Sequence, residues 1–378
     1  MNRASRFRVI FVAASLLIAA LILLAREHRP SFLRPGLRLY AYVSTGDNAV
    51  SVVDLVKLAT VARIPVGGNV SAMLEHPTRA EIWGVSSSGG FAWVIDSRTS
   101  QLVSRIPVGA LPYSLQFSPE GNRLYVPAAG SNTLSVVDCA TRQVVAHAPT
   151  GVQPVAARVS ADGKLVLVAN KQDATVGVYE AGTLELRATI PVVPDPEDAS
   201  VLPDDSVAFV LSRTQRRLSV VDLRRGQLLT NLELAGIPSE MILKPDGGEL
   251  YVLSPDAHGL QVINTSTHEV GDYMELGSAP IRGALLPDTG QLYVSDAAAG
   301  SVTAVDINYR RFIRPTIPAG QQPGALRFDP GDKARLLLVV SQASGDLSVI
   351  RIASDRPSGL LTMIPVGDQP RELAVKLF

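Results

Sequence analysis

The sequence predicts an all-β protein, an eight-bladed β-propeller, and three observations carry this prediction. A short apolar pattern that ends in an acidic residue recurs every 42 residues. Each period holds four short segments with the alternating apolar pattern of β-strands. The chain has 30 glycines and 26 prolines among 378 residues, which is more than the roughly 12% of average usage and fits a chain with many turns.

The acidic position is the clearest marker of the period. Seven copies follow one another at equal steps of 42 residues, and an eighth copy, which ends at Arg351, comes 45 residues later. The seven residues are Asp54, Asp96, Asp138, Glu180, Asp222, Asn264 and Asp306. Equal spacing of this kind indicates a repeated structural unit. We expect the carboxylate or amide at this position to accept backbone N–H groups of the next turn, and the turn after Arg351 to differ.

Two further columns keep the same register. Prolines stand sixteen residues after the acidic position in five consecutive copies, from Pro112 to Pro280, and Pro323 and Pro370 are slightly displaced. An apolar column stands thirteen residues before it, at Trp83, Tyr125, Leu167, Phe209, Tyr251 and Tyr293. One period is predicted to form strands at residues 113–117, 123–127, 134–138 and 143–148. Four strands in this length are typical of one propeller blade.

The ends of the repeat region set the number of blades. The region opens at residue 39 with a second-type strand and closes with residues 370–378, a first-type strand that lacks its companions. If this tail joins the N-terminal sheet, residues 39–378 make eight complete blades, four antiparallel strands each, and the ring has no free sheet edge. The alternative is seven blades, with the divergent last repeat outside the ring.

The N-terminal segment predicts export. Residues 1–8 are a basic region, residues 9–25 an apolar run, and residues 26–38 a linker. The length of the run lies between a secretory h-region and a full membrane span. Leucines stand where cleavage needs a small residue, so a signal anchor is favoured over a cleaved signal peptide. We therefore expect a cell-envelope protein with a single inner-membrane anchor at residues 9–25 and a propeller in the periplasm or outside the cell.

The charge distribution argues against one class of partner. The chain has 35 basic and 35 acidic residues, but seven of its arginines and only one acid precede residue 39, so the repeat region is acidic. It has no basic stretch with interleaved aromatic residues, which would supply the phosphate contacts of a nucleic-acid-binding protein. The expected partners are an envelope protein, a glycan or a small ligand, and nucleic acid is not expected. We also expect a monomer without a metal site or a cofactor.

The repeat resembles a known family. The strings Leu124-Tyr125-Val126 and Leu250-Tyr251-Val252, the SVVD strand and the segment Ile106 to Gly109 resemble the YVTN-type β-propeller repeat over about residues 38–378. This resemblance implies a surface-layer or periplasmic propeller, similar in fold to propeller lactonases and to the haem d1 domain of nitrite reductases. It implies little about activity, because these positions build the blades. No residue here matches the haem-ligating histidine of the haem d1 domain.

The central channel is the expected binding surface. In a propeller, the loops that join strand four to the next strand one, and strand two to strand three, meet around the channel on one face. The two residues after each repeat proline are predicted to form this rim. With neighbouring loop residues, the predicted ligand-binding rim consists of Tyr113, Asp195, Glu197, Asp198, Glu240, His258, Arg282 and Arg371. Such a rim suits a small zwitterion, a sugar acid or a cation; alternatively, its charges form ion pairs worth about 0 to 1 kcal/mol each.

No catalytic residue is assigned. Nucleophile elbows, phosphate-binding glycine loops, HExxH and CxxC are absent from the sequence, and its histidines lack metal-ligand spacing. The sequence favours a non-catalytic binding or scaffold module. One alternative is a lactonase-like hydrolase in which Glu197, Asp198 or Glu240 is the general base and Arg282 stabilises an oxyanion; the other is a haem-d1-type cofactor-binding propeller. A loop with Arg213 on the same face is either an exposed charged loop or an anion site.

Overall fold

The computed structural model describes residues 38–286, 288–330, 335–353 and 357–378. The predicted basic region, the predicted signal anchor and most of the linker, residues 1–37, lie outside the described residues. Among the residues that are described, no helix is long and apolar enough to cross a membrane. Residues 39–378 form a unit of their own.

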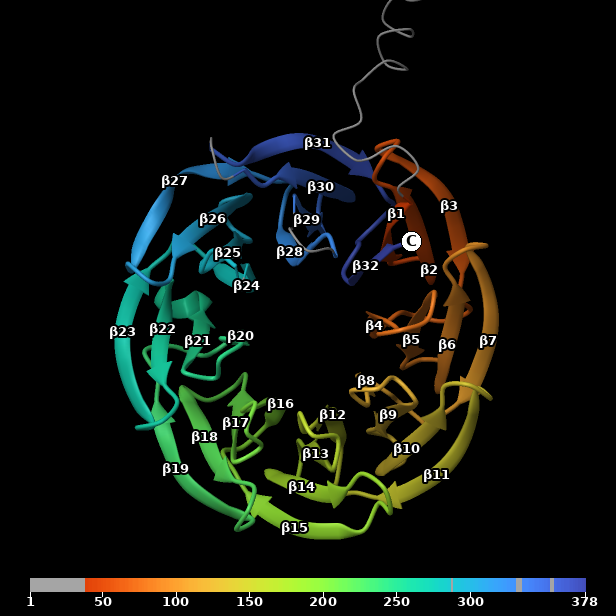
Figure 1. Ribbon diagram of the computed structural model, residues 1–378, viewed down its shortest axis with the longest axis vertical. Helices are drawn as coiled ribbons and strands as arrows, with labels where there is room; N and C mark the ends of the chain where they lie inside the picture. Colours follow the sequence, from red (N-terminus) through yellow and green to blue (C-terminus); the bar gives the residue numbers. More distant parts are fainter. Residues whose placement is uncertain (1–37, 287, 331–334, 354–356) are drawn as a thin grey trace, which may run out of the picture. The chain divides into compact units, whose positions relative to one another are not determined.

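Eight four-stranded antiparallel sheets are arranged around a common axis (Figure 1), and we number these blades in chain order. Blade 1 contains β1 (Leu39–Thr45), β2 (Ala49–Asp54), β3 (Ala59–Pro65) and β32 (Leu373–Leu377). Blade 2 contains β4 (Ala72–Glu75), β5 (Glu81–Ser86), β6 (Phe91–Asp96) and β7 (Gln101–Pro107). Blade 3 contains β8 (Gln116–Phe117), β9 (Arg123–Ala128), β10 (Thr133–Asp138) and β11 (Gln143–Pro149). Blade 4 contains β12 (Pro154–Val159), β13 (Leu165–Asn170), β14 (Thr175–Glu180) and β15 (Leu186–Pro191).

The other four blades repeat this order, with the first strand of each innermost and the fourth outermost. Blades 5 and 6 contain β16 (Pro196–Val201), β17 (Val207–Ser212), β18 (Arg217–Asp222), β19 (Gln227–Glu233); and β20 (Glu240–Leu243), β21 (Glu249–Ser254), β22 (Gly259–Asn264), β23 (Glu269–Glu275). Blades 7 and 8 contain β24 (Pro280–Leu286), β25 (Gln291–Asp296), β26 (Ser301–Asp306), β27 (Arg311–Pro318); and β28 (Pro323–Phe328), β29 (Leu336–Ser341), β30 (Asp346–Arg351), β31 (Gly359–Pro365). A short 3-10 helix, η1 (Pro255–Ala257), follows β21.

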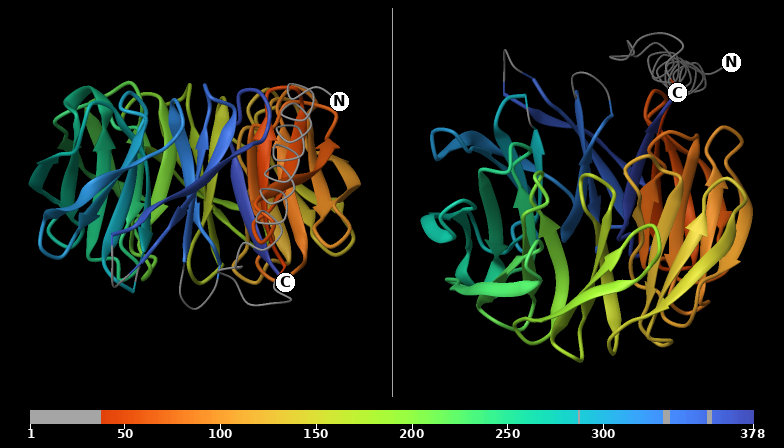
Figure 2. Two further views of the ribbon diagram at one scale, coloured as in Figure 1. Left: turned by 90° about the horizontal axis from the view of Figure 1, so that it is seen from above. Right: turned by 60° about the horizontal axis from the view of Figure 1, so that its bottom comes forward.

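The tail strand closes the ring. β32 pairs antiparallel with β1, with Leu39 opposite Leu377 and Val43 opposite Leu373. The backbone N–H of Ser44 also donates to the carbonyl of Glu372 at 3.0 Å. Figure 2 shows the last strand lying beside the first blade in the side view. The prediction of eight blades is confirmed, and the seven-bladed alternative is wrong because the last repeat forms a complete sheet within the ring.

The repeat prolines lie at irregularities of the innermost strands. The register of the first strand shifts directly after Pro154, Pro196, Pro280 and Pro323. Proline has no N–H to give to a ladder, so a bulge is a position where it is tolerated. In blades 4, 5 and 7 the residue directly after the proline has no pairing partner in the ladder, and in blade 8 the next two residues have none. In blade 3 the expected strand 113–117 is shorter than predicted, because only β8 and a bridge from Pro112 to Ala128 are formed.

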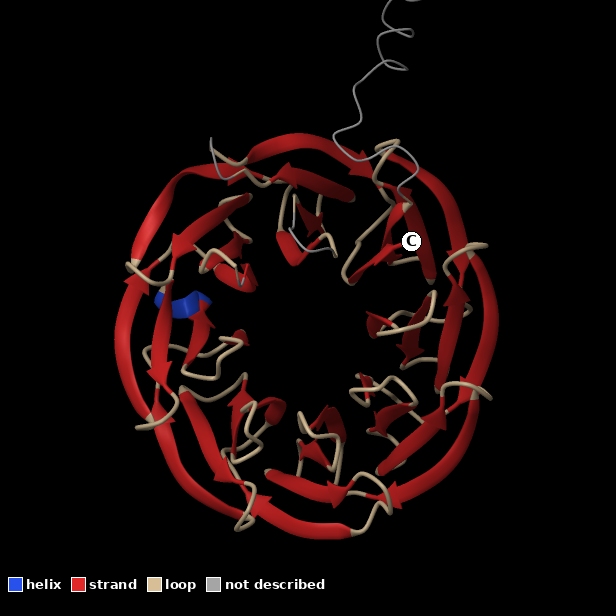
Figure 3. Cartoon of the chain, viewed as in Figure 1, coloured by secondary structure: helices blue, strands red, loops and turns tan. Residues whose placement is uncertain are grey.

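Six of the seven residues of the acidic column have the predicted role in turns. Figure 3 draws these turns in tan between the strands. The seventh residue, Glu180, pairs with Arg187 at 3.0 Å instead. The Oδ1 atom of Asp138 accepts the N–H groups of Ala140 at 2.9 Å and Thr141 at 2.8 Å. These bonds lower the pKa of Asp138. The same pair of bonds is made by Asp54, Asp96, Asp222, Asn264 and Asp306.

The core lies between adjacent blades. All six residues of the predicted apolar column are buried, with at most 1% of their surface exposed. Trp83 of blade 2, for example, packs edge-on against Phe117 of blade 3, with ring centroids 6.0 Å apart. Burial of such rings supplies much of the favourable free energy of folding. The blades therefore form one continuous scaffold that fixes the innermost strands in position.

Candidate functional site

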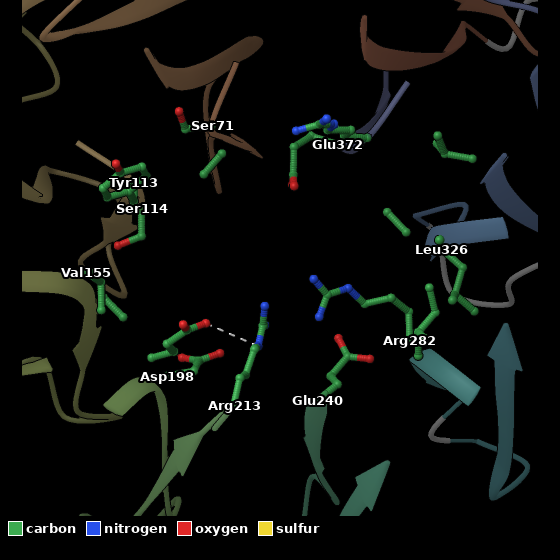
Figure 4. Close-up of a pocket in the computed structure, with 18 of the residues that line it drawn as sticks. Ser71, Tyr113, Ser114, Val155, Asp198, Arg213, Glu240, Arg282, Leu326 and Glu372 are labelled. Atoms are coloured by element: carbon green, nitrogen blue, oxygen red, sulfur yellow. Dashed lines mark ion pairs between the residues drawn. The ribbon is translucent and has the colours of Figure 1, made fainter. Parts of the chain in front are cut away.

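A cavity of about 880 Å³ lies at the centre of the ring, where the innermost strands meet (Figure 4). Its size falls within the range of small-molecule binding sites. Residues directly after the repeat prolines line it in most blades, because the bulges aim them inward. The polar lining residues are Ser71, Tyr113, Ser114, Gln153, Arg158, Lys171, Glu197, Asp198, Arg213, Glu240, Arg282, Arg327, Gln342, Arg371 and Glu372.

The structure brings six of the eight predicted rim residues to this cavity. They are Tyr113, Glu197, Asp198, Glu240, Arg282 and Arg371. The remaining two, Asp195 and His258, are not among the lining residues. Asp195 accepts a hydrogen bond from the Oγ1 atom of Thr214 at 2.9 Å. His258 follows η1 in a left-handed conformation, and its Nδ1 lies 2.7 Å from the carbonyl oxygen of Ser278.

On one side of the cavity, cations and acids neutralise each other. We call this side the closed half; it comprises Arg158, Lys171, Glu197, Asp198 and Arg213 of blades 4 and 5. Lys171 lies 2.5 Å from Glu197, and Arg213 lies 3.5 Å from the same carboxylate. Arg158 lies 2.5 Å from Asp198. The acids of the predicted rim thus form ion pairs on this side of the cavity. Their partners are Arg158, Lys171 and Arg213, and not the predicted rim arginines Arg282 and Arg371.

The opposite side carries arginines without such partners. We call it the open half; its charged residues are Arg282 of blade 7, Arg327 of blade 8, and Arg371 and Glu372 of blade 1. Within the described part of the chain, no carboxylate oxygen lies within 4.0 Å of a guanidinium nitrogen of these three arginines. Arg282 donates to the carbonyl of Ser239 at 3.3 Å, and Arg327 donates to the carbonyl of Leu326 at 3.2 Å. Two carbonyl bonds leave most of their donors available to a ligand.

Two glutamates extend into this cationic environment. Burial raises the pKa of the Glu240 carboxyl, and the nearby charge of Arg282 and a hydrogen bond from the N–H of Gly283 oppose this rise. Burial likewise raises the pKa of Glu372, against the opposing charges of Arg282 and Arg327. Figure 4 shows Arg282 and Glu240 side by side at the cavity wall. Neutralisation of either glutamate increases the net positive charge of the cavity.

Sequence reasoning missed Arg158, Lys171 and Arg327. Arg158 and Arg327 stand four residues after Pro154 and Pro323, and so two residues beyond the second predicted rim position. Side chains alternate across a strand with a period of two, so this position faces the cavity one step further along. The signal was therefore present in the sequence. Lys171 directly follows β13, where only the arrangement of neighbouring blades reveals its contact with Glu197.

Other reactive groups lie away from the cavity. Cys139 is buried, and burial raises its pKa to about 12, so it is not a ready nucleophile. The described histidines do not line the cavity. In the described ranges, no group of three or more His, Cys, Asp or Glu side chains is placed to share a metal ion. The chemistry of the site is therefore that of charged hydrogen-bond donors and two protonatable carboxyls.

Comparison with known proteins supports the β-propeller fold, and one family model matches part of the chain. The family model of the cytochrome D1 heme domain matches residues 82–229. No curated protein sequence matches the chain significantly. A structure of dihydro-heme d1 dehydrogenase NirN in complex with DHE is similar, with 18% identity, a TM-score of 0.70, and coverage of 92% of this chain and 77% of that chain.

Two further solved structures share the fold. Hydrazine synthase of Kuenenia stuttgartiensis is 21% identical, with a TM-score of 0.60, and the match covers 75% of this chain and 96% of that chain. A functionally unknown protein from Desulfotomaculum acetoxidans is 12% identical, with a TM-score of 0.59 and coverage of 73% and 94%. At these identities the likeness shows the propeller fold alone.

Proposed function

We propose that this protein is a binding module whose central cavity takes a small anionic ligand. One observation carries the proposal: six cationic and four acidic side chains line the cavity, and three of the cations are not paired with a described carboxylate. Arginine guanidinium groups bind carboxylate and phosphate through two parallel hydrogen bonds. An excess of unpaired arginine in an enclosed space therefore favours an anion over the cation or zwitterion that the predicted rim also allowed.

The test is a binding titration of the full chain in mild detergent, with citrate as the probe. We expect a dissociation constant of about 1 mM or lower, which corresponds to about −4 kcal/mol or better, and weakening at high salt because the contacts are ionic. The triple variant Arg282→Gln, Arg327→Gln, Arg371→Gln is the control and is expected to lose binding. Absence of binding for small carboxylates and phosphates alike contradicts the proposal.

The location and the finer family membership are part of the same proposal. The apolar run at residues 9–25, preceded by three arginines, supports export and tethering to the inner membrane, with the propeller in the periplasm or outside the cell. The YVTN-like strings support a surface-layer or periplasmic propeller. Fractionation of host cells and N-terminal sequencing of the mature protein test this: a soluble cytoplasmic chain that begins at Met1 contradicts it.

A second candidate ligand is a tetrapyrrole of the haem d1 kind, which the family match over residues 82–229 favours. The arginines of the cavity suit the carboxylates of such a molecule. An iron held in the usual way is not matched, because among the lining residues only Tyr113 belongs to a side-chain type that ligates haem iron. Absorbance between roughly 400 and 700 nm, measured on protein from its own host, tests this candidate; a colourless protein contradicts it.

A hydrolase of the lactonase kind is supported by one observation, the raised pKa of the half-buried Glu240 carboxyl beside Arg282. A general base works best with a pKa near the operating pH, and an arginine can stabilise an oxyanion. Turnover of a panel of lactones by the full chain, lost in Glu240→Gln, is the expected result for this candidate. Turnover that survives this substitution contradicts it.

A further inference from the structure

The closed and open halves of the cavity are built from equivalent positions. Arg158 and Arg327 both stand four residues after the bulge proline, on blades 4 and 8. Asp198 and Glu372 both stand two residues after a repeat proline, Pro196 at the bulge of blade 5 and Pro370 just before β32 of blade 1. Each arginine is followed in the ring by the blade that carries the acid. The two arginine–acid pairs are therefore related by half a turn of the eight-bladed ring.

In the closed half the arginine contacts its acid. Arg158 lies 2.5 Å from the Oδ1 of Asp198 and donates to the carbonyl of Ala199 at 3.2 Å, both on the next blade. It also donates to the carbonyl of Ala157, on its own strand, at 2.9 Å. Its donors are thus largely used by the protein, and little is left for a ligand.

In the open half only part of this arrangement is present. Arg327 donates to the carbonyl of Leu326, the equivalent of Ala157, at 3.2 Å. Its guanidinium has no carboxylate partner within 4.0 Å among the described residues, although Glu372 stands where Asp198 stands in the other half. The guanidinium therefore keeps the own-strand contact of Arg158 but lacks the contact with the next blade.

The neighbouring positions strengthen this difference. Glu197 of the closed half directly follows the bulge proline, and the equivalent residue of the open half is Arg371. Lys171, which follows β13, corresponds to Gln342, which follows β29. An acid is thus replaced by a cation, and a cation by a neutral amide. Arg282 of blade 7 completes an arc of three arginines over three consecutive blades.

We infer that the open half is the binding half, and that Arg282, Arg327 and Arg371 bind a ligand with two or three carboxylate groups while the closed half is structural. This inference rests on the proposed function. One carboxylate would replace the missing acid contact of Arg327. The others would engage Arg282 and Arg371, because each guanidinium can hold one carboxylate bidentately.

The test compares equivalent positions by isothermal titration of the full chain, in mild detergent, with citrate. Arg327→Gln is expected to weaken citrate binding about tenfold or more, the usual effect of losing one charge-assisted pair. The matched variant Arg158→Gln with Asp198→Asn removes the closed pair without changing the net charge, and is expected to alter citrate affinity by less than about threefold. Arg371→Gln is a second probe, because no side-chain bond in the described structure holds Arg371.

The outcomes separate this inference from the proposed function. The assignment of the open half is overturned if the closed-half double variant weakens citrate binding as much as Arg327→Gln does. It is also overturned if neither Arg327→Gln nor Arg371→Gln weakens citrate binding. In both cases, citrate binding by the wild-type chain still upholds the proposed function. Acetate is expected to bind at least about tenfold more weakly than citrate. Inorganic phosphate that competes with citrate at equal strength overturns the carboxylate part and assigns phosphate as the ligand chemistry. If none of the three probes binds the wild-type chain, the proposed function and this inference both fail.

Discussion

The buried Glu81 carboxylate makes a sharp prediction about how adjacent blades are held together. Glu81 of blade 2 is 7% exposed. It accepts a hydrogen bond from the indole N–H of Trp83 at 2.9 Å and pairs with Arg142 of blade 3 at 2.7 Å. Replacement of Arg142 by methionine keeps the apolar stem of the side chain and leaves the carboxylate with the Trp83 bond alone.

The expected cost follows from this environment. Removal of one partner from a fully buried ion pair costs about 3–5 kcal/mol. The Arg142 side chain is 33% exposed, so water reaches the site and reduces the penalty to about 2 kcal/mol. In a protein of this size, that corresponds to a fall in Tm of roughly 3 °C.

The assay is reversible urea unfolding, supported by thermal unfolding. Arg142 has a backbone φ of 56°, so any replacement must also be judged for strain. Arg142→Lys is the control, because it carries the same backbone strain and keeps the charge. Adding Glu81→Gln to Arg142→Met is expected to recover at least half of the loss, because the neutral amide costs less to bury without a cation. Equal stability of the methionine and lysine variants refutes the reasoning.

Three further predictions concern acid sensitivity, ring closure and the cavity. Burial lowers the pKa of His76, whose Nδ1 accepts two backbone N–H groups. The unfolded chain takes up a proton on this histidine at about pH 6.5, so the stabilising contribution is complete above that pH and is lost below it. Urea unfolding of a His76→Gln variant should therefore show a smaller fall in stability at low pH. Deletion of residues 370–378 exposes the edge of β1 and should cause aggregation, seen by size-exclusion chromatography. Glu372→Gln should tighten citrate binding at about pH 8 and have a smaller effect as the pH falls, because the raised pKa of Glu372 lets its carboxyl become neutral at a higher pH than an ordinary glutamate; an effect that does not change with pH contradicts this.

The fold was predictable because the repeat is encoded locally. A turn carboxylate such as Asp138 acts within three residues of its own position, and the apolar column needs only burial between neighbours. The rim was partly predictable, because the repeat proline marks the start of the innermost strand and so places the two residues after it near the channel. The predicted residues Asp195 and His258 belong to the loops beside these strands, where turn conformation and local hydrogen bonds set the side-chain direction.

The pairing of charges in the cavity was not predictable in the same way. Arg158 meets Asp198 from the adjacent blade, 40 positions away in the sequence. The equivalent residues of the other half, Arg327 and Glu372, stand 45 positions apart and do not form an ion pair in the described structure. Such contacts depend on the reach of long side chains across the gap between two blades. The repeat pattern places the Cβ atoms, but rotamers and competing backbone carbonyls decide which pairs form.

Residue pairs related by half a turn of the ring behave differently in the scaffold and in the cavity. The blade-linking pair Glu81–Arg142 recurs 168 positions later as Glu249–Arg310, and in both copies the arginine contacts the acid. A contact that holds blades together thus forms in both halves. The cavity arginines Arg158 and Arg327 occupy equivalent positions as well, but only the first contacts its acid. The scaffold forms the same ion pair at both positions, so the missing ion pair of Arg327 is a property of the cavity. A site that binds an anion on one side requires such a difference.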